Sequence, residues 1–141
     1  VSNEKDNTLS VIDSASMKVL KTVPVGKRPR GITLSKDGTQ LYICASDDNT
    51  VQVMDLATLK VIHNLPSGED PEQFVLAPDD KLLYIANEND AVTTVVDTQS
   101  RKVVAQILDY ARALVRWSYS DLQRQVAAPQ RVICHRRRFA I

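Results

Sequence analysis

Apolar and polar residues alternate in short runs over residues 1–107, with no competing 3.6-residue helical period. Four such runs follow one another in the middle of this part: 31–34, 41–45, 50–54 and 60–65. They are rich in β-branched and aromatic residues, which pack well on a pleated sheet. The pattern therefore predicts consecutive antiparallel strands and an all-β fold.

The residues between these runs are typical of tight turns. Gly38 can adopt the positive φ that a short hairpin needs. Asp47, Asp48 and Asn49 tolerate left-handed backbone and can bond their own main chain. The carboxylate of Asp55 is expected to accept backbone N–H bonds in the next turn.

The whole pattern repeats every 42 residues without a gap. Asp13, Asp55 and Asp97 are spaced in this way, within TLSVIDSASMKVL, TVQVMDLATLKVI and VTTVVDTQSRKVV. The same offset aligns PVGKRPRGITLSKDGTQLYI with PSGEDPEQFVLAPDDKLLYI. Four antiparallel strands in about 40–45 residues form one blade of a β-propeller.

The repeat divides the chain into just under three blades. Residues 1–25 supply part of one blade, residues 28–65 a second and residues 70–107 a third. A propeller closes with about four to eight blades, so this array is open and we expect a truncated fragment. Each blade covers its neighbour, so we expect a marginal fold with an exposed apolar face at each end.

The strand LYIAN (83–87) resembles the Tyr-Val-Thr-Asn (YVTN) β-propeller repeat, with LYICA (41–45) and the initial VSN as degenerate copies. Residues 1–107 are similar to the YVTN subfamily associated with catabolism that depends on pyrroloquinoline quinone (PQQ). This resemblance implies seven blades and an exported, periplasmic protein found beside PQQ-dependent dehydrogenases and c-type cytochromes. It implies no cofactor site in the propeller, and we predict no cofactor.

The repeat stops abruptly after Ile107. Position 110 is Tyr where the period requires Gly, and position 113 is Ala where it requires Pro. The formal charge of +1 hides a net −4 over residues 1–108 and +5 over residues 109–141. A frameshift near codon 107 explains this break, and the gene's DNA would test that hypothesis. Residues 108–141 are predicted to lie outside the propeller, as a disordered tail or with a helix over 109–125.

The tail ends in RVICHRRRFAI (131–141), which combines arginines with a Cys-His pair. A basic run is most often a solvated segment, so we assign no nucleic-acid partner, although an RNA-binding arm remains the alternative. Cys134 and His135 lack the second ligand pair of a zinc site, so we predict no metal. No apolar run approaches the ~18 residues that a membrane span needs.

The blades contain no motif of a known catalytic or phosphate site. Cys44 lies in an apolar run and is predicted to pack as a small hydrophobic residue. His63 is predicted to be an exposed strand histidine. Glu4, Glu88 and Asp90 lie in or beside a repeated turn, and we interpret them as solvated loop carboxylates.

Propeller ligands usually meet the axial funnel, near the innermost strands and the loops before them. The candidate funnel-facing groups in these segments are Arg28, Arg30, Glu72 and Gln73. The alternative is that they lie on surface loops without a ligand, because a fold does not determine a function. No catalytic residue is predicted.

The sequence favours a non-catalytic YVTN propeller. We expect a binding or scaffolding module associated with periplasmic PQQ-dependent alcohol oxidation, with a dehydrogenase, a cytochrome or an unidentified small molecule as its partner. The alternative is a fragment of a propeller enzyme, either a lactonase or a subunit of a quinone- or haem-dependent oxidoreductase. Its active site would then lie in the missing blades.

Overall fold

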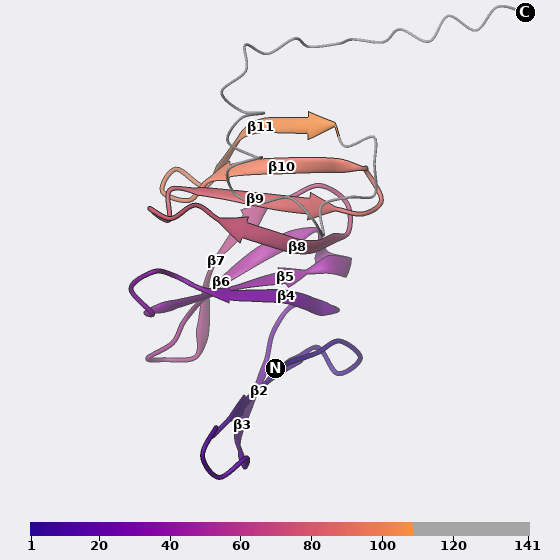
Figure 1. Cartoon of the computed structure of the whole chain (residues 1–141). Helices are drawn as coiled ribbons and strands as arrows, with labels where there is room; N and C mark the ends of the chain where they lie inside the picture. The colour runs from indigo at the N-terminus through magenta and orange to yellow at the C-terminus, as the bar shows by residue number, and fades with distance from the viewer. Residues whose placement is uncertain (109–141) are drawn as a thin grey trace, which may run out of the picture.

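Short alternating strands joined by tight turns form three antiparallel sheets in a computed structural model of the chain. The structure describes residues 1–108, and over these residues it is all-β apart from one single-turn 3-10 helix. The sheets follow one another in chain order, as successive blades do in a propeller (Figure 1). The predicted fold class, a partial β-propeller, is confirmed.

The first sheet has three strands in the order β1-β2-β3. They are β1 (Ser2–Asn3), β2 (Thr8–Ile12) and β3 (Val19–Pro24). Within the described residues this sheet has no counterpart of the strand that begins each of the other two sheets.

The second sheet is a complete four-stranded blade in the order β4-β5-β6-β7. Its strands are β4 (Pro29–Leu34), β5 (Gln40–Ala45), β6 (Thr50–Asp55) and β7 (Lys60–Pro66). The 3-10 turn η1 (Ser46–Asp48) connects β5 to β6. Asn49 ends this turn with a φ of 52°, as its residue type led us to expect.

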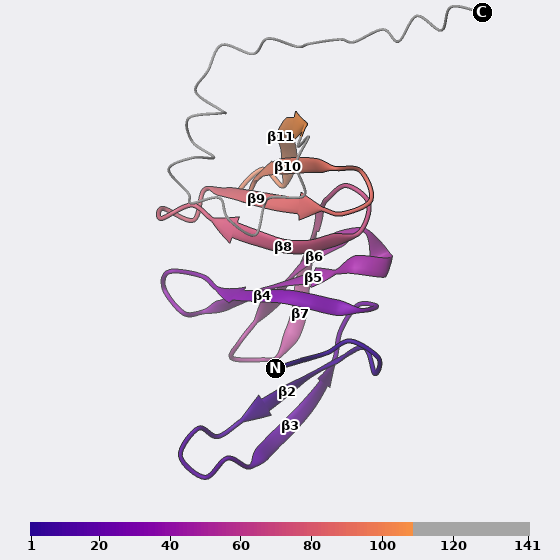
Figure 2. The ribbon, with the colours of Figure 1, turned by 45° about the vertical axis from the view of Figure 1, so that its right-hand side comes forward.

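The third sheet repeats this arrangement with β8 (Pro71–Leu76), β9 (Leu82–Asn87), β10 (Val92–Asp97) and β11 (Lys102–Leu108). The last strand extends one residue beyond the predicted boundary at 107. β4 and β8, the first strands of the two complete sheets, contact each other (Figure 2).

The turn after the third strand of each blade is closed by an aspartate. Each aspartate accepts a backbone N–H bond from the residue three positions later, at 2.6–2.7 Å: Asp13 from Ser16, Asp55 from Thr58, and Asp97 from Ser100. The predicted role of Asp55 is therefore confirmed. Gly38 has the predicted positive φ, 69°.

Each outer strand carries a β-bulge at the same place in the repeat. The pairing register shifts by one residue between Val11 and Ile12 in the first sheet, and at the equivalent points of the other two. The extra residues opposite these shifts are Leu20, Ile62 and Val104. A bulge bends the strand and increases its twist.

Two apolar seams join the three sheets. Leu9 and Val23 of the first sheet pack with Ile43 and Met54 of the second. The larger seam joins the second and third sheets, and its buried members are Tyr42, Cys44, Val51, Val53, Leu65, Leu83, Ile85 and Val96. Phe74 lies against this seam, with its ring edge-to-face to Tyr42 at a centroid distance of 6.4 Å.

The two ends of the array differ from each other. At the first sheet, Met17 and Val19 are exposed, as expected for an open end. At the third sheet, Tyr84 and Val95 are buried, in a cluster with Leu82, Ala105 and Ile107. The expectation of an apolar face exposed at each end is therefore wrong for the centre of the third sheet, where Tyr84 and Val95 are 3% and 0% exposed.

Among the described residues, no helix has the length and apolar character required to cross a bilayer. The helix considered at 109–125, the proposed frameshift product and the pair Cys134-His135 lie outside the described residues.

Candidate functional site

The first strand of each complete sheet follows a short loop whose backbone is held by side chains. We call residues 25–28 and 67–70 the lead-in loops. The N–H of Lys27 donates to Asp48 at 2.7 Å, and the N–H of Glu69 donates to Asp90 at 2.6 Å. Each carboxylate belongs to the same sheet as the loop that it binds. Each lead-in loop is thus fixed to its own blade.

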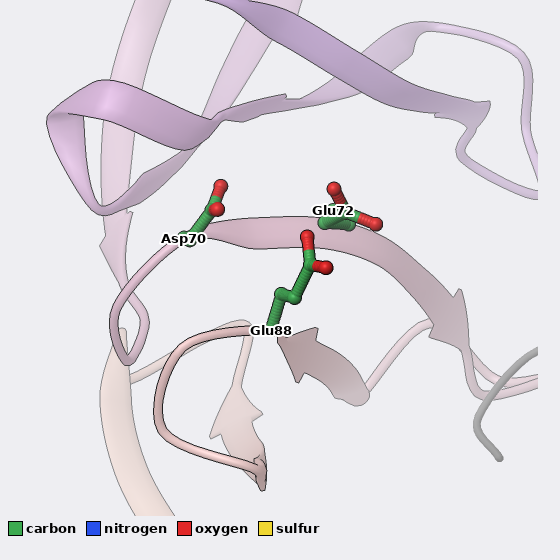
Figure 3. A group of neighbouring side chains, drawn as sticks. All are labelled: Asp70, Glu72 and Glu88. Atoms are coloured by element: carbon green, nitrogen blue, oxygen red, sulfur yellow. The ribbon is translucent and has the colours of Figure 1, made fainter. Parts of the chain in front are cut away.

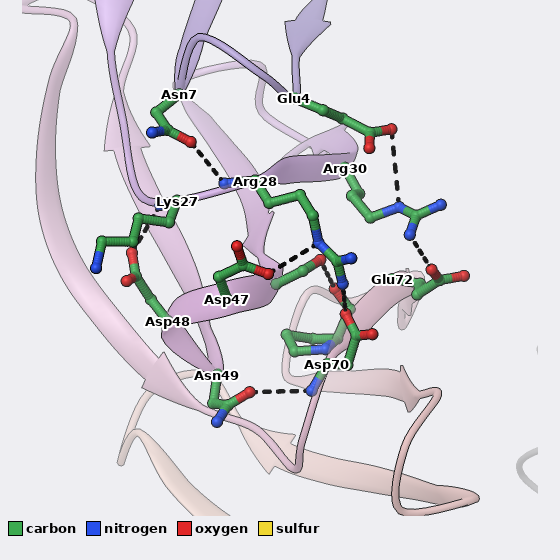
Figure 4. A network of polar contacts seen from close by, with 12 residues as sticks. Glu4, Asn7, Lys27, Arg28, Arg30, Asp47, Asp48, Asn49, Asp70 and Glu72 are labelled. Carbon is green, nitrogen blue, oxygen red and sulfur yellow. Dashed lines mark hydrogen bonds and ion pairs between the residues drawn. The ribbon is translucent and has the colours of Figure 1, made fainter.

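A second pair of bonds connects each lead-in loop to the preceding blade. The N–H of Arg28 donates to Asn7 at 2.8 Å, and the N–H of Asp70 donates to Asn49 at 3.0 Å (Figure 4). Arg28 and Asp70 both have positive φ, 48° and 55°. Side chains of the loop's own blade and of the preceding blade therefore hold this left-handed backbone, which sets the direction of the side chains that follow.

Arg28 forms the centre of the first ion-pair group. Its Nη2 pairs with Asp70 of the third sheet, and its Nε lies 3.0 Å from Asp47 in the turn η1. The hydrogen bond to Asp70 raises the pKa of Arg28 despite the opposing effect of burial. Arg28 and Asp70 occupy the same position in successive repeats, so the pair joins two blades at equivalent points.

Arg30, two residues further along the chain and within β4, forms the second group. Its guanidinium pairs with Glu72 of the third sheet, and its Nε lies 3.8 Å from Glu4 of the first sheet (Figure 4). This group therefore connects residues of all three sheets. The side chains of Arg30 and Glu72 remain 31% and 27% exposed, so solvent reaches both.

Three carboxylates gather beside these arginines. Oxygen atoms of Asp70, Glu72 and Glu88 all lie within 4.8 Å of one another (Figure 3). Burial raises the pKa of Glu72, and its contact with Glu88 raises it further. Such a trio has the donor chemistry of a hard cation site. Arg28 and Arg30 already supply positive charge to two of its members, however, so we assign no metal to it.

We call this set of seven residues the charged face: Glu4, Arg28, Arg30, Asp47, Asp70, Glu72 and Glu88. It has five carboxylates and two guanidinium groups, an excess of acid. All five acidic side chains are at least partly exposed. The chemistry available is electrostatic attraction of a cationic group and hydrogen bonding to it.

The structure brings together three of the four predicted site residues. Arg28, Arg30 and Glu72 belong to the charged face. Gln73 is exposed, and its Oε1 lies beside Gly31 of β4. The pairing register of β8 shifts between Pro71 and Gln73, so Glu72 lies at an irregularity of the strand and Gln73 follows it. Whether these groups face the funnel of a closed ring stays a prediction.

Sequence reasoning missed Asp47 and Asp70 as members of this group. One signal was present for Asp70. At an offset of 42 residues, Arg28 is replaced by Asp70 and Arg30 by Glu72. Equivalent positions of adjacent blades lie near each other, so a reversal of charge there indicates an ion pair across the seam. Asp47 carries no such signal, because its side chain reaches Arg28 from a turn.

Three loop carboxylates have more partners than predicted. Glu4, Glu88 and Asp90 are exposed, as expected for solvated side chains. Glu4 nevertheless pairs with Arg30, Glu88 contacts Glu72, and Asp90 accepts the N–H bond of the lead-in loop. They are therefore solvated loop carboxylates, as predicted, and each also has a polar partner on a neighbouring segment.

The structure also shows the burial of Cys44 and His63. Cys44 is fully buried as a free thiol, and burial raises its pKa to about 12, which agrees with the predicted packing role. His63 lies on β7 and is half-buried rather than exposed. It pairs with Val53 across the ladder to β6, and this position explains the partial cover.

Residues 3–105 match the family model described as "Lactonase, 7-bladed beta-propeller". Among solved structures, the chain is similar to hydrazine synthase from Kuenenia stuttgartiensis, with 26% identity and a TM-score of 0.71. That match covers 77% of this chain and 32% of the other, so it spans about a third of the length of hydrazine synthase. The comparison with curated proteins found no match.

Proposed function

Because the chain belongs to the family of lactonase seven-bladed β-propellers, we propose that it acts as a non-catalytic propeller module that binds a partner through the charged face. One observation carries this proposal. The charged face draws residues from three successive sheets, and its carboxylates outnumber its two arginines. A surface with this excess of acid attracts a basic group and orients it as it approaches.

The setting that we propose is periplasmic PQQ-dependent alcohol oxidation. The strand LYIAN and the 42-residue repeat support this proposal through their resemblance to the YVTN subfamily. The partner would be a periplasmic dehydrogenase or a c-type cytochrome that presents lysine or arginine side chains. An unidentified small cationic ligand would use the same chemistry.

Titration of the 141-residue chain against a PQQ-dependent dehydrogenase and a c-type cytochrome, at low and high salt, tests the proposal. Binding should weaken with salt, because exposed charges are screened. Glu72→Gln and Glu88→Gln should each weaken it about two- to fivefold at low salt.

Asp79→Asn is the matched control, since this exposed turn carboxylate makes the same change of charge outside the charged face. No binding of either partner, or equal weakening by the control, would count against the module.

A propeller enzyme is the second candidate, and the name of the matched family favours it. Hydrazine synthase, one of the solved structures that resemble the chain, is also an enzyme by name. A lactonase, or a subunit of a quinone- or haem-dependent oxidoreductase, would place its reacting groups in blades beyond these three. Hydrolysis of a simple lactone by a chain extended with those blades, and unchanged by Glu72→Gln, would favour this candidate over the binding module.

A further inference from the structure

Arg30 of strand β4 lies between two carboxylates that belong to different sheets. Its guanidinium pairs with Glu72 of the third sheet, and its Nε lies 3.8 Å from Glu4 of the first sheet. All three side chains are partly open to solvent, with Arg30, Glu72 and Glu4 exposed by 31%, 27% and 50%. Arg30 can therefore shift from one carboxylate to the other without leaving the charged face.

Glu72 also faces a carboxylate, that of Glu88 in the turn after β9. Oxygen atoms of these two side chains and of Asp70 lie within 4.8 Å of one another (Figure 3). Within residues 1–108, Glu88 has no ion pair with a basic side chain. The contact between Glu72 and Glu88 is therefore unfavourable when both are ionised, and it becomes a hydrogen bond when one of them holds a proton.

The surroundings of Glu72 favour its protonated form. Burial raises the pKa of Glu72 above the ordinary value of 4.5, and the hydrogen bond with Glu88 raises it further. Arg30 lowers this pKa, whereas the charges of Glu88 and Asp70 raise it. Arg28, the other cation nearby, is already paired with Asp70. Glu72 thus begins to take up a proton before the pH has fallen to 4.5.

We propose that acidification exchanges the partner of Glu72. At neutral pH its carboxylate pairs with Arg30 and connects the third sheet to the second. As the pH falls, Glu72 takes a proton from solvent and donates it in a hydrogen bond to Glu88, while Arg30 keeps Glu4 as its carboxylate. The ion pair of Arg30 thereby moves from the seam between the second and third sheets to the seam between the first and second.

The exchange takes place within the folded chain. Because the pKa of Glu72 is raised by folding, protonation of this group favours the folded state. This stabilising effect appears as the pH falls through the raised pKa, and it is complete below 4.5. One of the five carboxylates of the charged face then holds a proton, so a cationic partner meets less negative charge in acid. This last consequence alone rests on the proposed function.

NMR titration of the glutamate carboxyl carbons in the full 141-residue chain tests the exchange without any partner. The midpoint of Glu72 should lie above 4.5, and the Nε signal of Arg30 should change with the same midpoint. A midpoint of Glu72 at or below 4.5, or an Arg30 signal that does not change in that step, would overturn the proposal. The wild-type chain suffices for this test, so it stands even if a variant fails to fold.

Glu88→Gln removes the like charge and keeps a side chain of the same size. It should lower the midpoint of Glu72 by about half a pH unit or more, because a neighbouring negative charge disfavours ionisation. Asp79→Asn is the matched control, since this carboxylate is 58% exposed and pairs with Lys81 outside the charged face. The control should leave the midpoint unchanged, and equal shifts in the two variants would contradict the role of Glu88.

Urea unfolding of Arg30→Gln, Glu72→Gln and the double variant measures the coupling between these two side chains. The coupling should be present at neutral pH and lost just below the midpoint of Glu72, whereas the coupling of Arg30 with Glu4 should persist there. A coupling between Arg30 and Glu72 that is unchanged in acid would overturn the exchange, whether or not the charged face binds a partner.

Discussion

A glycine N–H ties each lead-in loop to its own sheet through one side chain. In the third sheet, the N–H of Gly68 donates to Asn87 Oδ1 at 3.1 Å. The amide of Asn87 then donates to Thr94 Oγ1 at 2.7 Å. Asn87 is buried, so its polar atoms need these partners.

The second sheet makes the same tie with a different residue. Ala45 stands at the position of Asn87 and has no polar side chain. Gln52, at the position of Thr94, is longer, and its Oε1 accepts the N–H of Gly26 at 2.7 Å. Ala45 on β5 cannot accept this bond, and Gln52 on the adjacent strand β6 accepts it instead.

Gln52→Ala should lower the free energy of unfolding by about 0.5–1.5 kcal/mol, because the N–H of Gly26 loses its acceptor. The double variant Ala45→Asn with Gln52→Thr rebuilds the arrangement of the third sheet and should recover most of this loss. Urea unfolding of the single and double variants gives the coupling energy. Strictly additive effects would show that the two positions do not compensate each other.

Only some residues of the charged face could be predicted from the sequence. Arg28, Arg30 and Glu72 could be selected because they flank the proline that begins an inner strand in each repeat. Asp47 and Glu88 could not, because turn geometry and side-chain length decide which cation they reach. Gln73 was selected for its place in the sequence alone, and its side chain lies beside Gly31 of β4 instead.

At the scale of the element, the aspartate turn recurs with the same hydrogen bond in all three sheets. Hydrogen bonds from a serine or threonine lower the pKa of Asp13, Asp55 and Asp97 below the ordinary value of 3.8. A lowered pKa in the folded chain means that folding favours the ionised carboxylate. This contribution is complete above 3.8 and is lost as the pH falls through the lowered pKa.

Replacing all three aspartates with asparagine should therefore remove part of the acid sensitivity. The triple variant should be less stable than the wild-type chain at neutral pH, and the difference should shrink as the pH falls below 3.8. Urea unfolding at several pH values measures both curves, and each single variant should show a part of the effect. A difference that grows on acidification would contradict the assigned role.

Strands and turns could be predicted closely because alternation, glycine and aspartate leave local signals. The residue that ends each aspartate turn carries no such signal in the sequence. Met17, Leu59 and Arg101 all have positive φ, between 55° and 60°, although none is a residue type that favours this region. Their N–H groups bond to the carbonyl of the turn aspartate at 2.8 Å, so the turn imposes the conformation.

For the whole molecule, the two seams differ in how completely they are enclosed. The seam between the second and third sheets has an inner strand on both sides, β4 and β8. Within residues 1–108, the seam between the first and second sheets has one on the side of the second sheet only. Ile43 and Ile85 are equivalent residues at these two seams, and both are completely buried.

Ile43→Val and Ile85→Val should each cost about 0.5–1.5 kcal/mol of stability. Ile85→Val should cost more, because its surroundings are held by strands on both sides and can relax less into the space left by the methyl group. Equilibrium unfolding in denaturant compares the two, and the double variant tests whether the seams act independently. A larger cost for Ile43→Val would contradict this view of the seams.

The bulge in each outer strand restricts how blades can be recombined. Leu20, Ile62 and Val104 differ in type, yet each is the extra residue of the bulge at the same position of its outer strand. The geometry has thus been copied while the amino acid changed, as expected after duplication of an ancestral unit. Deleting such a residue would shift the rest of the strand by one and turn its side chains to the opposite face. Chimeric propellers built from this chain should therefore be spliced at equivalent points, 42 residues apart, so that every blade keeps its own bulge.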